Sequence, residues 1–302
     1  MRCLIPAAIL GFGPLGAMAA PPEIVADTPV TGSLVQQVLG DLGEVRVLID
    51  KGGDPHHYQM RPSDARALQS AGVLFWIGPE LTPWLERAAT GLGQSKSLSL
   101  LHAEGTQLRS YAESGHDEHD DHDGHDHSGV DAHAWLDPTN AEIWLGTIAN
   151  SLSELDPDNA ATYAANAEAA RSRLAALDAE IAAKLAPVAQ MPFVVFHDAY
   201  GYFTTHYGLT PAIAVSLGDA SAPSAARLAE IHSQIIDSKA VCAFPEFGHD
   251  PSLIDSVIQG IDIRVGAELD PAGRALTDEA SLYETVLQGL SSTLTDCLSA
   301  PS

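Results

Sequence analysis

A short acidic stretch with five histidines holds the residue types in this chain that are best suited to metal chemistry. Residues 115–127 read GHDEHDDHDGHDH, and the imidazoles belong to His116, His119, His122, His125 and His127. Neutral imidazole is a common ligand for zinc and other borderline metals, and the interleaved carboxylates add oxygen ligands. Because no apolar residue anchors the stretch in a core, we expect a polar loop at 115–128. It is either a secondary, weak metal site or a surface insertion whose histidines bind nothing.

Three further histidines stand where an α/β fold places its ligands. His56 follows an expected strand at 45–49, His197 directly follows one at 193–196, and His133 lies just past the polar loop. Ligands of open α/β sheets bind beyond the carboxyl ends of the strands. Each histidine alone is consistent with a hydrogen-bonded structural role. Taken together, beside a histidine-rich loop, they predict one metal ion held between two halves of the molecule.

Strands and helices alternate along the chain in two blocks. We expect strands at the β-rich runs 24–26, 45–49, 73–77, 97–101, 193–196, 212–215, 241–244 and 263–265. We expect helices at 33–39, 63–70, 80–89, 140–155, 200–206, 224–237, 252–259 and 282–298. Such alternation is typical of the α/β class. It predicts two lobes, each a mostly parallel sheet flanked by helices.

One long helix separates the two blocks. Asp156-Pro157-Asp158 is a helix-start signal, and Pro187 ends the pattern. Between them the apolar residues fall at steps of three and four, which marks one helical face: Tyr163, Ala167, Ala170, Leu174, Leu177, Ile181 and Leu185. At 1.5 Å per residue this rod is roughly 40–45 Å long, enough to cross from one lobe to the other. We therefore expect lobes at 20–155 and 188–302, linked by a helix at 156–187.

The N-terminus and the charge restrict where the protein works and what it contacts. Residues 1–19 have a basic start, a short apolar run and a small-x-small end, which predict a secretory signal peptide cleaved near Ala19. The formal net charge of -25 disfavours nucleic acid and anionic lipid and attracts cations. Removal of the signal leaves Cys242 and Cys297. In an oxidising compartment two cysteines suggest one disulfide, with two buried free thiols as the alternative.

Three motifs resemble those of a known family. They are GGDPHHYQMRPSD at 52–64, DAHAWLDP at 131–138 and FHDAYGYF at 196–203. In this order, with a histidine-rich loop between the first two and a long helix, they resemble the periplasmic metal-binding components of zinc and manganese ABC importers. The loop and the Cys242/Cys297 pair are most similar to the zinc-uptake (ZnuA-like) branch.

The resemblance implies a function, a site and partners. His56, His133 and His197 would be zinc ligands in a cleft between lobes that the long helix hinges stiffly. The protein would be a periplasmic monomer and not an enzyme. It would deliver Zn²⁺ to a cognate inner-membrane ABC permease, with periplasmic zinc chaperones as further candidate partners and no nucleic acid.

The fourth ligand position stays open at this stage. Family members use a water, a carboxylate beside the first histidine or a late aspartate; Pro55 removes the second option, and Asp270 matches the third. Asp270 is equally suited to capping a turn. Glu246 lies where the family has a different order of residues, which leaves its role in doubt. Asp131 and Asp198 are candidate acceptors for ligand N–H groups, and His57 is expected to face solvent.

Two other functions fit parts of the pattern. Three histidines and an open position also describe a catalytic zinc site, so an exported zinc hydrolase is one alternative. The sequence contains no His-Glu-x-x-His motif in support of it. The other alternative is a manganese or iron importer component, or a surface adhesin of the same fold. Three imidazoles with one oxygen favour zinc, because manganese usually takes more carboxylate oxygen.

Overall fold

The computed structural model describes residues 23–49, 52–91, 96–111, 129–216, 223–276 and 281–300. The expected signal peptide and the histidine-rich loop lie outside these ranges, so both stay predictions. Within these ranges, none of the helices combines the length and the apolar character needed to span a bilayer.

The first lobe is built on a parallel sheet of four strands in the order β2-β1-β3-β4. The strands are β1 (Glu23–Ala26), β2 (Val45–Val47), β3 (Ala71–Trp76) and β4 (Lys96–Ser99). Alternate side chains of β3 enter two separate hydrophobic clusters, with Val73 and Phe75 on one face and Leu74 and Trp76 on the other. Both faces of β3 are thus buried, which explains why this central strand is almost continuously apolar.

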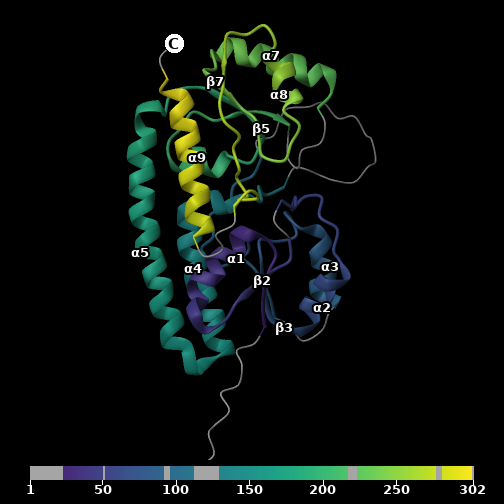
Figure 1. Cartoon of the computed structure of the whole chain (residues 1–302), viewed down its shortest axis with the longest axis vertical. Helices are drawn as coiled ribbons and strands as arrows, with labels where there is room; N and C mark the ends of the chain where they lie inside the picture. The colour runs from purple at the N-terminus through teal and green to yellow at the C-terminus, as the bar shows by residue number, and fades with distance from the viewer. Residues whose placement is uncertain are drawn as a thin grey trace, which may run out of the picture.

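Helices cover both faces of this sheet, and the sequence marks where they begin. The helices are α1 (Pro29–Leu39), α2 (Pro62–Ser70), α3 (Pro83–Gly91) and α4 (Pro138–Leu155). Thr28 caps α1 and Asp137 caps α4, each accepting a hydrogen bond from a backbone N–H of the first turn. A proline follows each cap, where its fixed φ suits the first helical position. Figure 1 shows α2 and α3 on the outer face and α1 and α4 on the inner one.

The second lobe repeats the plan with a parallel sheet in the order β6-β5-β7-β8. Its strands are β5 (Phe193–His197), β6 (Ile213–Ser216), β7 (Cys242–Phe244) and β8 (Arg264–Val265). Its helices are α6 (Gly201–His206), α7 (Ala225–Ser238), α8 (Ser252–Val257) and α9 (Leu282–Leu298). Helices α7 and α8 cover one face of this sheet (Figure 1). The expected fold class is therefore confirmed in both halves.

The long helix α5 (Ala160–Leu185) runs past both lobes (Figure 1). All seven apolar residues expected on its inner face are buried. Helix α9 packs along α5 and also touches α1 of the first lobe. One hydrophobic cluster consequently contains side chains from both sheets and from α1, α4, α5 and α9.

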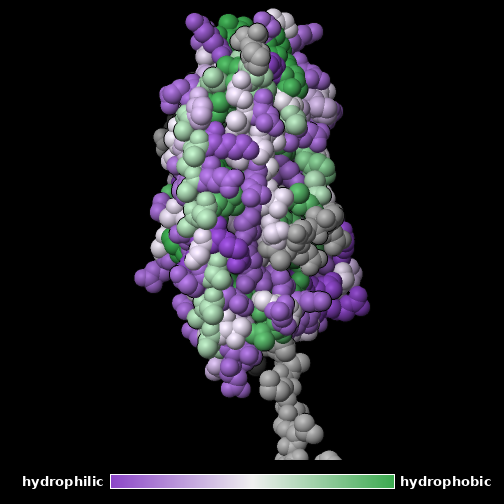
Figure 2. Space-filling model, turned by 60° about the vertical axis from the view of Figure 1, so that its left-hand side comes forward, coloured by the Kyte–Doolittle hydropathy of each residue, from purple (hydrophilic) through white to green (hydrophobic). Residues whose placement is uncertain are grey.

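The outer flank of this helix layer is polar. Figure 2 shows mostly hydrophilic side chains, with strongly hydrophobic ones as scattered spots, which is ordinary for a protein surface. The predicted disulfide is present: Cys242 and Cys297 are joined with Cα atoms 6.3 Å apart. It fastens the end of α9 to β7 of the second lobe.

Candidate metal centre

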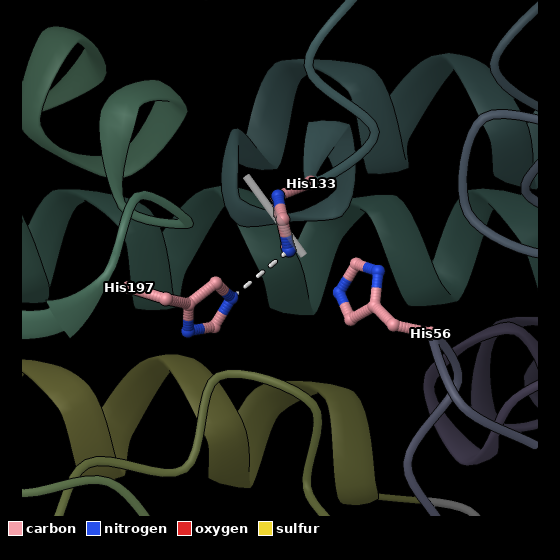
Figure 3. Close-up of side chains that lie close together, drawn as sticks. All are labelled: His56, His133 and His197. Carbon is pink, nitrogen blue, oxygen red and sulfur yellow. Dashed lines mark hydrogen bonds between the residues drawn. The ribbon is translucent and has the colours of Figure 1, made fainter. Parts of the chain in front are cut away.

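The three histidines predicted as ligands converge between the lobes (Figure 3). His197 is the last residue of β5, and His133 precedes the short turn Ala134–Leu136 that leads into α4. His56 lies in the turn segment between β2 and α2. His133 and His197 are buried and His56 is half-buried. The first lobe thus supplies two imidazoles and the second lobe supplies one.

The distances suit one tetrahedral ion. The Nε2 atoms of His133 and His197 are 3.3 Å apart. Two nitrogens each 2.0–2.1 Å from one zinc at the tetrahedral angle would be about 3.3–3.4 Å apart. The ring centroid of His56 is 5.5 Å from that of His133 and 6.1 Å from that of His197. One nitrogen from each ring lies within 4.8 Å of the other two, so a small movement of His56 would complete a three-nitrogen site.

Buried carboxylates orient two of the rings. Nδ1 of His133 is 2.8 Å from Asp131 Oδ1, and Nδ1 of His197 is 2.8 Å from Glu246 Oε2. When Nδ1–H donates to a carboxylate, the Nε2 lone pair is left free for a metal. Asp131 therefore has the role that the sequence suggested. Glu246 lies just beyond β7, which pairs with β5, and it takes the place beside His197 that the sequence left in doubt.

A residue that sequence reasoning missed stands behind Asp131. Arg109 Nη1 is 2.9 Å from Asp131 Oδ2, and the Asp131 side chain is fully buried. The hydroxyl of Tyr202, in α6 of the second lobe, donates to the Asp131 carbonyl and accepts from the Arg109 backbone N–H. Guanidinium, carboxylate and imidazole thus form one chain that fixes His133. Only the tertiary fold brings Arg109 to this place, so no local pattern marked it.

Burial and neighbouring charges move the pKa values of His56 and His197 in opposite directions. Burial, with the nearby His133 and His197, lowers the pKa of His56 to about 3, so this ring is neutral at neutral pH. Burial also acts to lower the pKa of His197, but the carboxylates of Glu246, Asp54 and Asp198 together outweigh it and raise that pKa above its usual value. Metal binding requires neutral imidazole, so protons compete with the metal at His197 at a higher pH than at His56.

The three histidines line a cavity, and Asp270, the expected fourth ligand, lines it as well. In this structure, however, the Asp270 carboxylate stabilises a turn of the backbone. Its two carboxylate oxygens accept the backbone N–H groups of Arg274 and Ala275 at 2.9 and 2.8 Å. Among the described residues, the side chains whose ligand atoms lie close enough together to hold one metal ion are the three histidines, and Asp270 is not one of them. Its ligation stays a prediction. His57 is exposed, as expected.

His249, which the sequence gave no clear role, lines the cavity too. Its ring centroid lies 4.4 Å from that of Phe196, and its Nε2 is 3.5 Å from Glu246 Oε1. It therefore packs beside the carboxylate that orients His197.

Comparison with known proteins decides the family. Residues 24–297 match the model of the family described as zinc-uptake complex component A, periplasmic (ZnuA). The chain belongs to this family. The high-affinity zinc uptake system protein ZnuA of Paracoccus denitrificans (strain Pd 1222) is 55% identical to it over an alignment of 319 residues that covers 98% of each chain.

Solved structures agree with the assignment. A zinc-bound ZnuA with residues 138–173 deleted superimposes with a TM-score of 0.78 at 26% identity, over 93% of this chain and 99% of that one. A manganese-bound mutant of a periplasmic metal-binding protein from Candidatus Liberibacter asiaticus has the same TM-score, 0.78, at 20% identity, over 91% of this chain and 98% of that one. The second likeness concerns the fold alone, so the choice of metal must come from the site.

Proposed function

We propose that this chain is the periplasmic component of a high-affinity zinc importer. It captures Zn²⁺ between its two lobes and hands the ion to an ABC permease of the inner membrane. The observation that carries this proposal is the pair of Nε2 atoms 3.3 Å apart, each on a ring whose Nδ1 is held by a buried carboxylate. Two imidazoles so oriented present their free lone pairs to one point.

The donor set favours zinc over manganese. Three neutral nitrogens and one oxygen suit tetrahedral Zn²⁺, whereas manganese usually takes more carboxylate oxygen. The carboxylates of Asp131 and Glu246 stand behind the rings, where they raise the basicity of the ligands and offset the charge of the ion. The fourth ligand is Asp270 or a water.

The other parts of the proposal follow from family and sequence. The family is one of zinc-uptake components rather than of enzymes, and we infer that this chain catalyses no reaction. The leader at 1–19 would export it, and it would act as a monomer that periplasmic zinc chaperones load. The histidine-rich loop would add weaker zinc sites that feed the tight one.

Single substitutions of the ligands test the site. His56→Ala, His133→Ala and His197→Ala should each abolish tight zinc binding, because a two-histidine remnant leaves half of the tetrahedron to water. The exposed neighbour provides the matched control, and His57→Ala should bind as the wild type does. The measurement is a competition titration against a zinc chelator of known affinity, repeated with manganese as competitor. Tight binding retained in any two of the three variants, or a preference for manganese, would contradict the proposal.

A further inference from the structure

The segment 269–275 of the second lobe lines the metal cavity and bonds to the first lobe at two points. At one point, the indole Nε1 of Trp135 donates to the carbonyl of Pro271 at 2.8 Å, and Trp135 is 2% exposed. At the other, Arg274 meets Gly52: the Gly52 N–H donates to the Arg274 carbonyl at 3.0 Å, and Arg274 Nη2 donates to the Gly52 carbonyl at 3.1 Å. The first bond is buried, whereas the second lies at the surface.

Arg274 is well anchored on its own side. Its Nη1 donates to the Phe247 carbonyl at 3.3 Å and lies 3.4 Å from His249 Nε2. The guanidinium packs against Gly248, where a Cβ would come within 2.9 Å of it and where φ is +79°. A side chain there would displace the guanidinium, and the left-handed backbone also favours glycine. The second lobe thus presents a fixed guanidinium to Gly52.

Gly52 begins the segment that carries a ligand. Asp54, two residues on, accepts the backbone N–H of His56 at 3.0 Å, which fixes the turn around that histidine. Arg274 interacts electrostatically with the same Asp54 carboxylate. Movement of Gly52 away from Arg274 would therefore carry with it the one ligand ring of the three that is half-exposed.

We propose that Arg274 acts as a latch, by which we mean that its contact with Gly52 holds the two lobes together at the metal cavity. Arg274 is thus a positioning residue that sets how fast bound zinc leaves. The inference rests on the proposed function and concerns the same site. The buried hydrogen bond from Trp135 to the Pro271 carbonyl stays formed, and segment 269–275 moves about this fixed point. The exposed bond of Arg274 opens, because water readily replaces the partners of a surface hydrogen bond. Opening releases the His56 turn and exposes the ion on that side.

The positive charge of Arg274 affects the rate of zinc release in the opposite direction. This effect must be measured separately from that of the contact with Gly52. A guanidinium beside a cation site repels the ion, so removal of the charge alone would slow release. Loss of the hydrogen bond from the forked guanidinium to the Gly52 carbonyl would speed the release of zinc. Lysine keeps the charge but lacks the fork, so Arg274→Lys isolates the geometric effect, and Arg274→Gln removes both.

The experiment is a stopped-flow measurement on the full mature protein. Protein carrying one equivalent of zinc is mixed with excess EDTA, and association is followed separately with free zinc. Arg227→Gln is the matched control, because Arg227 pairs with Glu230 at 3.3 Å within α7 of the same lobe. We expect Arg274→Gln and Arg274→Lys to release zinc about tenfold faster, which corresponds to about 1.4 kcal/mol. Association should stay within about twofold of the wild-type rate, and the control should match the wild type.

Each other outcome has a definite meaning. Release at the wild-type rate or slower in both Arg274 variants overturns the latch, and so does slower release in Arg274→Gln alone, which would show charge repulsion to dominate. Equal changes in association and release would show a general structural role and overturn it too. Failure of the wild-type protein to hold one tight equivalent would instead refute the proposed function, and the latch with it.

Discussion

His206 offers a sharp test of how the two lobes are held together. Its ring lies at the end of α6 between two carboxylates, with Nδ1 2.9 Å from Asp137 Oδ1 and Nε2 2.8 Å from Asp178 Oδ1. Asp137 caps α4 of the first lobe and Asp178 lies on α5. The hydrogen bond to Asp137 is the main cause that raises the pKa of His206 to about 9, against the opposing effect of burial. One charged imidazole thus joins three helices.

The raised pKa of His206 gives both the sign and the size of its effect on the free energy of unfolding. The folded pKa lies above the usual 6.5, so the charged ring stabilises the folded state fully below about pH 6.5, and this contribution is lost as the pH rises through about 9. At 1.36 kcal/mol per unit the upper bound is about 3.4 kcal/mol. Because 20% of the His206 side chain and 30% of the Asp178 side chain are exposed, solvent screening reduces it to about 1.5 kcal/mol. His206→Gln should therefore lower the free energy of unfolding at about pH 6 by about 1.5 kcal/mol, which corresponds to a fall of roughly 3–6 °C in the melting temperature.

The assay is denaturant unfolding of chelator-treated protein at about pH 6 and about pH 10. The free energy of unfolding of His206→Gln should lie below that of the wild type at the lower pH. This deficit should shrink at the higher pH, where the wild-type ring has become neutral. His232→Gln is the control, because His232 Nδ1 bonds the Val257 carbonyl instead of a carboxylate, and its deficit should not follow this pattern. A His206→Gln deficit of equal size at both pH values would refute the reasoning.

Three further predictions concern the residues behind the site and the crosslink. Glu246→Gln should weaken zinc binding by about 10–100-fold in a chelator competition, because the ring of His197 loses its anionic partner; an unchanged affinity would contradict this. Gly201→Ala should weaken zinc binding by roughly tenfold, because its Cβ would displace the Arg109 guanidinium, whereas Gly289→Ala in open space on α9 should not; equal affinities would show that Arg109 is dispensable. Reduction of the disulfide should lower the free energy of unfolding by about 4 kcal/mol for a separation of 55 residues, and an unchanged denaturation midpoint would exclude this.

The sequence predicted those parts of the fold that depend on local patterns. The inner face of α5 follows from steps of three and four, and the helix expected at 224–237 corresponds to α7, which Ser224 caps. The start of α1 was placed at Ser33, whereas the helix begins at Pro29 after its Thr28 cap. The place of α9 was beyond prediction, because its periodicity gives an apolar face without the partner that covers it.

The site divides along the same line. The three ligands were predictable because each lies within a short motif, and His197 directly follows a strand. Arg109 and Glu246 were not, because what they contact depends on how distant segments pack. Arg109 reaches Asp131, which is 22 residues further along the chain, and Glu246 reaches His197 from just beyond β7. Asp270 shows the limit of a motif, since the same carboxylate suits a metal or a turn.

The continuous core that joins both sheets through α5 and α9 has a consequence for engineering. Neither half would bury all of its apolar side chains if it were expressed alone, since Leu174 and Leu290 belong to the same cluster as Phe75 and Phe193. A chimaera that exchanges one lobe with a relative would have to exchange matching faces of these helices as well. The practical unit for recombination is therefore both lobes together with the helices that join them.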